Sequence, residues 1–279
     1  MIGAIVIFAF GSIVGSFLNV CIHRMPLGES VVWPGSHCPK CKKRIHAYDN
    51  IPYISYLFLG GKCRFCHQKI SFRYVIVELL TAALFVILFN KYGISYDLFF
   101  YMVLFAALIA ATFIDIAHRI IPDEISIGGI ILGFILSTIK GINLKPLAFA
   151  PAHMFNSLLG IVAGGAVIYL TGKAFDLVYF KLLKHPPIQG ETESMGGGDV
   201  KLLAMIGAFL GWQKALAVFL LAPFFGVIVG VWSLIFKKDH TIPYGPFLSL
   251  AAILSALWLG QIVGFYTSSM DKILNLIFP

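Results

Sequence analysis

The stretch DLFFYMVLFAALIAATFIDIA, residues 97–117, is apolar over almost its whole length and carries an aspartate, Asp115, close to its end. Apolar runs of about 20 residues are long enough to cross a bilayer as a helix. Further runs occur at about 2–21, 74–91, 123–140, 155–176, 199–213, 214–236 and 246–266. The 279-residue chain is 59% hydrophobic and 12% charged, which is too apolar for a soluble domain. We therefore predict an all-α polytopic membrane protein with about eight transmembrane helices.

Two of these segments have unusual glycine patterns. Residues 2–21 lack the basic start and the small-residue cleavage site of a signal peptide. Gly11 and Gly15 instead predict a retained helix that packs closely against another helix. Residues 199–213 are interrupted by two glycines, so we expect this helix to be tilted or to span the membrane only in part.

The distribution of Lys and Arg predicts the orientation in the membrane. If the N-terminus lies outside, sixteen of the 21 basic residues fall on the cytoplasmic side. Nine of those sixteen belong to one long segment, residues 22–73, which carries most of the weight of this prediction. The basic balance does not indicate nucleic-acid binding, because basic and aromatic residues do not alternate as they do in a nucleic-acid groove. A second soluble stretch, residues 177–198, is rich in Pro, Gly and Glu and predicts a mobile loop.

Residues 22–73, called here the four-cysteine domain, contain four of the five cysteines. They form two C-x-x-C pairs separated by 21 residues: Cys38 with Cys41, and Cys63 with Cys66. Two such pairs supply four thiolates for tetrahedral Zn²⁺, and four protein ligands leave no open position, as in a structural site. A segment this poor in apolar clusters would draw much of its stability from the metal. A redox pair and two disulfides are the alternatives, which a reducing cytoplasmic location disfavours.

Two aspartates at helix ends are the candidate catalytic residues. Asp115 lies near the end of the 97–117 segment, and Asp199 opens the sixth helix after Gly196-Gly197-Gly198. In the predicted topology both lie at the cytoplasmic edge of the membrane. Two carboxylates at close range share one proton, so that one activates water and the other donates to a carbonyl oxygen. We expect the glycines to adopt positive φ angles and to let a substrate approach the backbone. Alternatively, Asp199 caps a helix and Asp115 pairs with Arg119.

Two further acidic residues are less specific. Asp123 follows Ile121-Pro122 at the start of the fourth helix, where an acidic residue is favoured, so capping is the simpler role and tuning of Asp115 the alternative. Glu78 lies within the second helix, where an acidic side chain is costly. A pair with Arg73 or Lys69 would explain it without a function.

The chain resembles the type IV prepilin peptidases, bifunctional leader peptidases and N-methyltransferases of the GxGD aspartyl protease class. The matching segments run in the family's order along nearly the whole chain: Gly15-Ser-Phe-Leu-Asn-Val, Arg24-Met-Pro, both C-x-x-C pairs, Asn50-Ile-Pro-Tyr-Ile-Ser, Ile70-Ser-Phe-Arg-Tyr, Glu78-Leu-Leu-Thr, Asp115 with Ile121-Pro-Asp, and Gly196-Gly-Gly-Asp-Val-Lys-Leu-Leu. A small departure is Tyr74-Val75 where the family usually has Tyr-Pro.

The resemblance implies an enzyme of the bacterial inner membrane with its active site at the cytoplasmic face. Asp115 and Asp199 would cleave the basic leader of prepilins or pseudopilins in type IV pilus or type II secretion systems. The new N-terminal amine would then be methylated from S-adenosylmethionine. The residues expected to lie at the substrate or to support the pair are Gly196, Gly198, Asp123, Lys201 and Glu78. The expected division is a first helix (1–21), the zinc-binding, methyltransferase-associated domain (22–73) and a membrane peptidase domain (74–279).

Three alternatives remain at this point. A peptidase without methylation is the nearest. A transporter would place acidic residues on broken helices of repeated halves near the middle of the membrane, whereas these acidic residues lie at the membrane edge. A zinc-stabilised scaffold for pilus assembly would do no chemistry. The sequence alone locates no methyl-donor site, because it has no glycine-rich dinucleotide-type fingerprint, and it does not define the oligomeric state.

Overall fold

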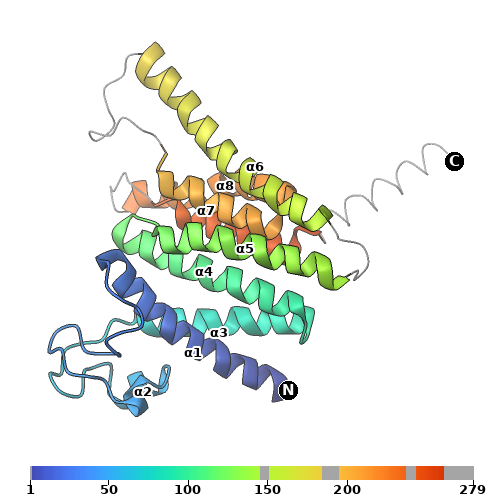
Figure 1. Ribbon diagram of the computed structural model, residues 1–279. Helices are drawn as coiled ribbons and strands as arrows, with labels where there is room; N and C mark the ends of the chain where they lie inside the picture. Colours follow the sequence, from blue (N-terminus) through green and yellow to red (C-terminus); the bar gives the residue numbers. More distant parts are fainter. Residues whose placement is uncertain (1, 145–150, 184–194, 237–242, 261–279) are drawn as a thin grey trace. The chain divides into compact units, whose positions relative to one another are not determined.

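The computed structural model describes residues 2–144, 151–183, 195–236 and 243–260 (Figure 1). Helices account for most of these residues, and the only β pairing among them is two isolated bridges, His37 with Arg44 and Lys62 with Lys69. The predicted all-α class is therefore confirmed for the part of the chain that the structure describes.

The long helices coincide with the predicted apolar segments. Their bounds are α1 Ile2–Arg24, α3 Arg73–Tyr92, α4 Tyr96–His118, α5 Asp123–Leu144, α6 Pro151–Asp176, α7 Gly197–Leu210, α8 Trp212–Phe236 and α9 Gly245–Leu254. The end of the last predicted segment, residues 261–266, lies outside the described residues. The short elements are the 3₁₀ turns η1 Met25–Leu27 and η2 Ala47–Asn50, the helix α2 Ile54–Phe58, and the π-helical turns η3 Leu177–Leu182 and η4 Ser255–Leu259.

One predicted loop begins later than expected. We expected a mobile loop over residues 177–198, but η3 continues the helical path of α6 to Leu182. The apolar and aromatic residues Leu-Val-Tyr-Phe at 177–180 favour this continuation over a loop. Residues 184–194 of the predicted loop lie outside the described residues.

Five helices among the described residues are long and apolar enough to cross a membrane: Ile2–Leu27, Arg73–Tyr92, Tyr96–His118, Ala152–Leu182 and Trp212–Trp232. The membrane-embedded character is therefore supported, whereas the predicted count of eight spans is not confirmed. Helix α7 has only 14 residues, which is shorter than the length of about 20 residues that a membrane-spanning helix needs.

Residues Met1–Ile125 form one compact unit, in which α1, α3 and α4 pack together. Close contact between α1 and α3 occurs at the two glycines that the sequence singled out. A β-carbon on Gly11 would lie 2.7 Å from the Cα of Ala82, and one on Gly15 would lie 2.7 Å from the Cα of Glu78. Because such approaches exclude any side chain, the prediction of tight packing by the first helix is confirmed.

The end of α1 organises the loop that leads into the four-cysteine domain. Arg24 is only 6% exposed. Its guanidinium donates to the carbonyl oxygens of Ser30, Pro34 and Gly35 at 2.7–3.1 Å. One buried side chain therefore satisfies three backbone carbonyls of a segment that has no regular secondary structure. These hydrogen bonds hold the segment that leads to the first cysteine pair.

The second compact unit is Ser126–Pro279. Its short helix α7 contacts α6, α8 and α9. Where α6 and α7 cross, Gly160 and Gly207 face each other so closely that a β-carbon on either would collide with the backbone of the other. Gly164, one turn further along α6, meets the carbonyl of Leu203 in the same way. Small residues at such spacing allow helices to pack backbone to backbone within a membrane.

The last turn of α7 is held by two serine side chains. Ser137 of α5 and Ser157 of α6 both donate to the carbonyl oxygen of Ala208, at 2.9 and 2.7 Å. Helix ends leave their last carbonyls without partners in the helix, and apolar surroundings make that costly. Gly211 then turns the chain into α8 with φ 81°, a conformation that favours glycine. The serines and glycines together fix α7, the helix that carries Asp199.

Candidate functional site

The four cysteines converge on one point. The sulfur atoms of Cys38, Cys41, Cys63 and Cys66 all lie within 4.8 Å of one another, and those of Cys38 and Cys66 are 3.8 Å apart. A zinc ion bound tetrahedrally at a Zn–S distance of about 2.3 Å requires sulfurs about 3.8 Å apart. The cysteines are free thiols in the described structure, and a disulfide would need sulfurs about 2.05 Å apart. The arrangement therefore suits a metal ion and does not contain the two disulfides considered as an alternative.

The two cysteine pairs are built as copies of one ten-residue turn, which we call a knuckle: residues 36–45 and 61–70. In the first, Lys42 N donates to Cys38 O at 2.9 Å; in the second, His67 N donates to Cys63 O at 3.0 Å. Both donors have left-handed backbones, with φ 58° and 53°. Each knuckle is closed by an isolated β bridge across its base.

The same correspondence extends to the ends of the knuckles. Ile45 N donates to Ser36 O at 2.8 Å, and Ile70 N donates to Gly61 O at 2.7 Å. The cysteine spacing was recognised from the sequence, but this duplication was not predicted. The signal was available, because the cysteines and the closing isoleucine recur at an offset of 25 positions.

The knuckle backbone favours ionised sulfur. Backbone hydrogen bonds from Cys66 and Phe65 to the Cys63 sulfur lower the pKa of that thiol to about 7. The backbone hydrogen bond from Gln68 acts in the same direction on Cys66, but burial and the neighbouring cysteine sulfurs outweigh it and raise the pKa of that thiol to about 11. The two directions differ because four adjacent sulfurs cannot all carry negative charge without a cation among them. A bound metal ion supplies that charge.

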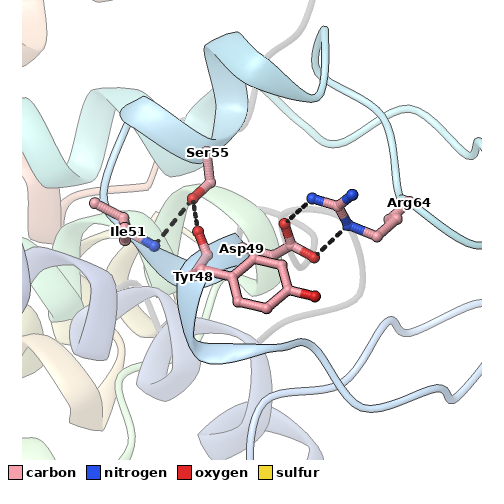
Figure 2. Close-up of polar contacts among 5 residues, drawn as sticks. All are labelled: Tyr48, Asp49, Ile51, Ser55 and Arg64. Carbon is pink, nitrogen blue, oxygen red and sulfur yellow. Dashed lines mark hydrogen bonds and ion pairs between the residues drawn. The ribbon is translucent and has the colours of Figure 1, made fainter.

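An ion pair ties the second knuckle to the segment between the knuckles. Arg64 donates from Nε and Nη2 to the two carboxylate oxygens of Asp49 at 2.7 and 2.6 Å, as Figure 2 shows. The guanidinium also lies over the Tyr48 ring, 5.4 Å from its centroid. The Arg64 hydrogen bond holds the pKa of the Asp49 carboxyl below its usual value. Two parallel hydrogen bonds fix direction as well as distance, so η2 has a defined position beside the knuckle.

Ser55 anchors the same segment to α2. Its hydroxyl donates to Tyr48 O at 2.8 Å and accepts from Ile51 N at 3.0 Å (Figure 2). Ser55 is 7% exposed. The segment between the knuckles is therefore specified by side-chain hydrogen bonds to its backbone as well as by the cysteines.

Asp115 lies in the last turn of α4. It is 6% exposed, and its backbone carbonyl accepts from the N–H of Arg119, which ends the helix in a left-handed conformation at φ 57°. An acidic side chain buried to this extent at the end of an apolar helix is costly, and such residues commonly serve a function.

Asp199 lies in the first turn of α7, which begins at Gly197. Its N–H donates to Gly196 O at 3.1 Å, and a β-carbon on Gly196 would lie 3.6 Å from its Oδ2. The expectation that the preceding glycines adopt positive φ is wrong: Gly196 has φ −68°, and Gly197 and Gly198 already belong to the helix. What the glycines provide is open space, since a β-carbon on Gly197 would meet no atom within 4 Å.

The remaining residues expected at the site lie on α3, α5 and α7. Asp123 is the first residue of α5, as predicted for a helix start. Lys201 and Gly198 lie in the first turns of α7 and are partly exposed. Glu78 of α3 is 7% exposed and accepts a hydrogen bond from Tyr53 N at 2.8 Å. It forms no ion pair with Arg73 or Lys69 in the described structure.

The structure thus brings the four cysteines together as predicted. Asp115 belongs to the first compact unit and Asp199 to the second, and each is described within its own unit. Fold and site together define a class: a helical membrane protein with a four-cysteine metal site directly after its first helix.

Comparisons with known proteins give the family. Residues 9–92 match the Bacterial Peptidase A24 N-terminal domain, and residues 102–231 match the Type IV leader peptidase family. The chain belongs to the type IV leader peptidase family, which the similar proteins described next also support. It is accordingly a membrane enzyme of a peptidase and methyltransferase family. No solved structure matches the chain significantly.

Several similar proteins carry the name prepilin leader peptidase/N-methyltransferase. One from Aeromonas salmonicida is 32% identical over 95% of this chain and 94% of its own length. One from Pseudomonas aeruginosa is 34% identical over 92% of this chain and 90% of its own length. One from Myxococcus xanthus is 38% identical over 83% of this chain, and the match spans 63% of that protein.

Proposed function

We propose that this protein cleaves the leader peptide of type IV prepilins or pseudopilins and then methylates the new N-terminal amine. The observation that carries the proposal is the match over nearly the whole chain to proteins named for both activities. The four-cysteine site supports it, because it lies in the part of the chain that matches the peptidase family's N-terminal domain.

Asp115 and Asp199 are the proposed catalytic pair. Hydrolysis needs one carboxylate ionised, to take a proton from the attacking water, and the other protonated, to donate to the carbonyl oxygen of the scissile bond. Asp199 lies in the first turn of a helix, where the positive end of the helix dipole favours the ionised form. We therefore assign the base role to Asp199 and the acid role to the buried Asp115. Asp123 and Lys201 are the residues proposed to support them.

The open backbone at Gly196 and Gly197 fits an extended peptide substrate. A peptide segment must expose its backbone to both carboxylates, and side chains on the preceding loop would block its approach. The absence of neighbours around Gly197 leaves that path free in the described structure. Gly196 and Gly198 are proposed to lie along the same path, because neither carries a side chain.

Zinc is the proposed ion at the four cysteines. Tetrahedral thiolate sites of this spacing select zinc among the common divalent ions. With four protein ligands no position remains for a substrate, so the ion stabilises the four-cysteine domain and takes no direct part in the reaction. This domain, residues 22–73, then serves methyl transfer, and residues 74–279 serve cleavage.

The methylation step uses S-adenosylmethionine as the methyl donor. The amine nitrogen of the cleaved pilin attacks the methyl carbon, the carbon–sulfur bond breaks, and a proton leaves the nitrogen as S-adenosylhomocysteine is released. The chain's own residues have to hold the donor, exclude water and accept that proton.

The proposed location is the bacterial inner membrane, with cleavage at the cytoplasmic face. The proposed partners are prepilins or pseudopilins of type IV pilus or type II secretion systems, and the surrounding lipid. The hydrophobic helix of such a substrate packs among the enzyme's helices and presents its membrane-edge peptide bond to the carboxylates.

Asparagine substitutions test the catalytic pair. Asp115→Asn and Asp199→Asn should each reduce cleavage of a prepilin in membranes by at least about 100-fold, the scale of a lost acid–base group. Asp97→Asn, at the other end of α4, is the matched control and should cleave normally. Retained cleavage in either of the first two variants, at equal expression, refutes the pair.

A peptidase without methylation is the second candidate, favoured only if the four-cysteine domain does not serve methyl transfer. Mass spectrometry of the processed pilin distinguishes the two. We expect a mass increase of one methyl group with the intact enzyme and none with Cys38→Ser. An unmethylated product from the intact enzyme would leave leader cleavage as the sole activity.

A further inference from the structure

A cavity of about 410 Å³ lies within the first compact unit, between the end of α1, the start of α3 and the four-cysteine domain. Pockets that bind small molecules commonly have volumes of about 300–1,000 Å³. Its lining includes Cys38 of the first knuckle together with three polar side chains at the helices, Asn19, Arg73 and Glu78.

Asn19 brings an unused acceptor to this cavity. The residue is 2% exposed, and its side-chain Nδ2 donates to Tyr74 O at 3.0 Å. That bond fixes which end of the amide is oxygen. The oxygen, Oδ1, is buried and has no hydrogen-bond partner in the described structure. Buried polar atoms in folded proteins are nearly always hydrogen-bonded, so an acceptor left without a partner points to a group that binds there.

Arg73 brings an unused donor. Its Nε is buried and likewise has no acceptor in the described structure. Arg73 is the first residue of α3 and is followed by Tyr74, whose carbonyl holds the Asn19 amide. The lining of this cavity therefore contains both an unpaired acceptor, on Asn19, and an unpaired donor, on Arg73. Tyr74 connects them, because it follows Arg73 in the chain and accepts the hydrogen bond from Asn19.

Glu78 adds a charge one turn further along α3. One carboxylate oxygen accepts from Tyr53 N at 2.8 Å. Tyr53 has φ 44°, which is unusual for a residue with a side chain. Its hydroxyl lies 2.7 Å from Ser12 Oγ of α1. Strained backbone of this kind persists where the surroundings hold it, often beside a ligand. In this conformation the Tyr53 N–H donates to the Glu78 carboxylate, and the hydrogen bond holds that carboxylate in the lining of the cavity.

These groups define the ligand that would satisfy them. Asn19 Oδ1 and the Glu78 carboxylate call for a hydrogen-bond donor with positive charge, and Arg73 calls for an acceptor with negative charge. An α-amino acid end supplies both, because its ammonium and carboxylate groups are attached to the same carbon. The methyl donor carries such an end, and the proposed function requires a place for it.

We propose that this cavity binds the amino-acid end of S-adenosylmethionine, with Asn19 and Glu78 receiving its ammonium group and Arg73 receiving its carboxylate. The proposal rests on the methyltransferase half of the proposed function. In this proposal Asn19, Arg73 and Glu78 bind the methyl donor, in a cavity that Cys38 of the first knuckle also lines.

The test compares two ligands that differ at this end. S-adenosylhomocysteine has the amino-acid end and transfers no methyl group, whereas 5′-methylthioadenosine lacks that end. Binding is measured by calorimetry on the full-length protein in lipid nanodiscs. We expect the wild type to bind S-adenosylhomocysteine at least about tenfold more tightly than 5′-methylthioadenosine. Each hydrogen bond to a charged group changes the dissociation constant by about a factor of ten.

The variants are Asn19→Leu, Arg73→Leu and Glu78→Gln. Each should weaken S-adenosylhomocysteine binding about tenfold and leave 5′-methylthioadenosine binding unchanged. Glu78→Gln keeps an acceptor for Tyr53 N–H, so it removes charge without disturbing the fold. Asn90→Leu, on an exposed position near the other end of α3, is the matched control. Metal content and thermal stability in the nanodiscs confirm that each variant is folded.

The outcomes separate this proposal from the proposed function. The assigned contacts are wrong if the wild type binds S-adenosylhomocysteine and methylates pilin but the variants bind both ligands as the wild type does. They are also wrong if the variants lose affinity for S-adenosylhomocysteine and 5′-methylthioadenosine by the same factor. If the wild type binds neither ligand and methylates no pilin, methyltransferase activity and this site fall together. A pilin peptide with a free N-terminal amine should bind alongside S-adenosylhomocysteine. Competition between them would assign the ammonium site to the pilin amine and overturn the proposal.

Discussion

Between residues 36 and 70 the chain holds four sulfurs together with short turns. In the second unit, by contrast, α7, which carries Asp199, is positioned by direct backbone packing against α6. In the first region each cysteine pair is shaped by hydrogen bonds within ten residues of chain. In the second, Gly160 and Gly207 meet across 47 positions of sequence. One region depends on an ion and local turns, and the other on close helix contacts. A substitution that unfolds one of these two regions should therefore leave the structure of the other intact.

Removing the metal should have the largest effect. Structural zinc binding contributes roughly 10–16 kcal/mol in small domains, so Cys63→Ser together with Cys66→Ser should unfold the four-cysteine domain. We expect methylation to disappear and protease sensitivity within residues 36–70 to rise, while leader cleavage continues. Metal analysis and pilin mass spectrometry measure this. Loss of cleavage together with methylation would show that the two regions are not independent.

The converse change is Gly160→Ala. Alanine normally stabilises a helix by about 1 kcal/mol over glycine, but here its β-carbon meets the Gly207 backbone. Overpacking of this kind costs about 1–3 kcal/mol. We expect lower thermal stability and weaker leader cleavage, with metal content unchanged.

Gly128→Ala is the control for that change, because a β-carbon at Gly128 in α5 meets nothing within 4 Å. It should cleave as the wild type does. Equal behaviour of the two alanine variants would mean that the α6–α7 crossing does not depend on glycine at that position.

The serines at the end of α7 should give a smaller, non-additive effect. Ser137→Ala or Ser157→Ala alone leaves the Ala208 carbonyl one donor, and such hydrogen bonds in membranes average about 0.6 kcal/mol. The double variant leaves neither serine donor and should cost about 2 kcal/mol. A double-mutant cycle on unfolding in detergent measures the difference. If the two single substitutions lower the unfolding free energy by amounts that sum to the effect of the double variant, the two serines do not act through the same Ala208 carbonyl.

The smallest effect is expected at the ion pair of Figure 2. Arg64 is largely exposed, and exposed pairs contribute little. Arg64→Gln should accelerate release of the bound metal ion to a chelator by about twofold. Lys62→Gln, in the same knuckle but without this pair, should leave the rate unchanged. A change of the same size in both variants would assign the effect to net charge rather than to the Asp49 contact.

The sequence predicted the features that depend on local pattern. The apolar runs located the helices to within a few residues, and the cysteine spacing identified four side chains that converge where they could hold a metal ion. Contacts between distant residues escaped it. Nothing in the apolar α6 sequence tells which helix Gly160 will meet, and Glu78 could have paired with a lysine as readily as with the N–H of Tyr53. The glycines before Asp199 were located correctly but explained by the wrong conformation, because a helix start and a left-handed turn both favour glycine.

The duplicated knuckles have a consequence for the chain between them. Because each knuckle already holds two sulfurs in register, metal binding closes one loop, between Cys41 and Cys63, rather than gathering four separate ligands. The entropic cost of a loop rises only slowly with its length. Residues 46–60 can therefore vary in length at little expense to the metal site. Within that loop, the position of Tyr53 is set by its contacts with α1 and Glu78 rather than by the metal.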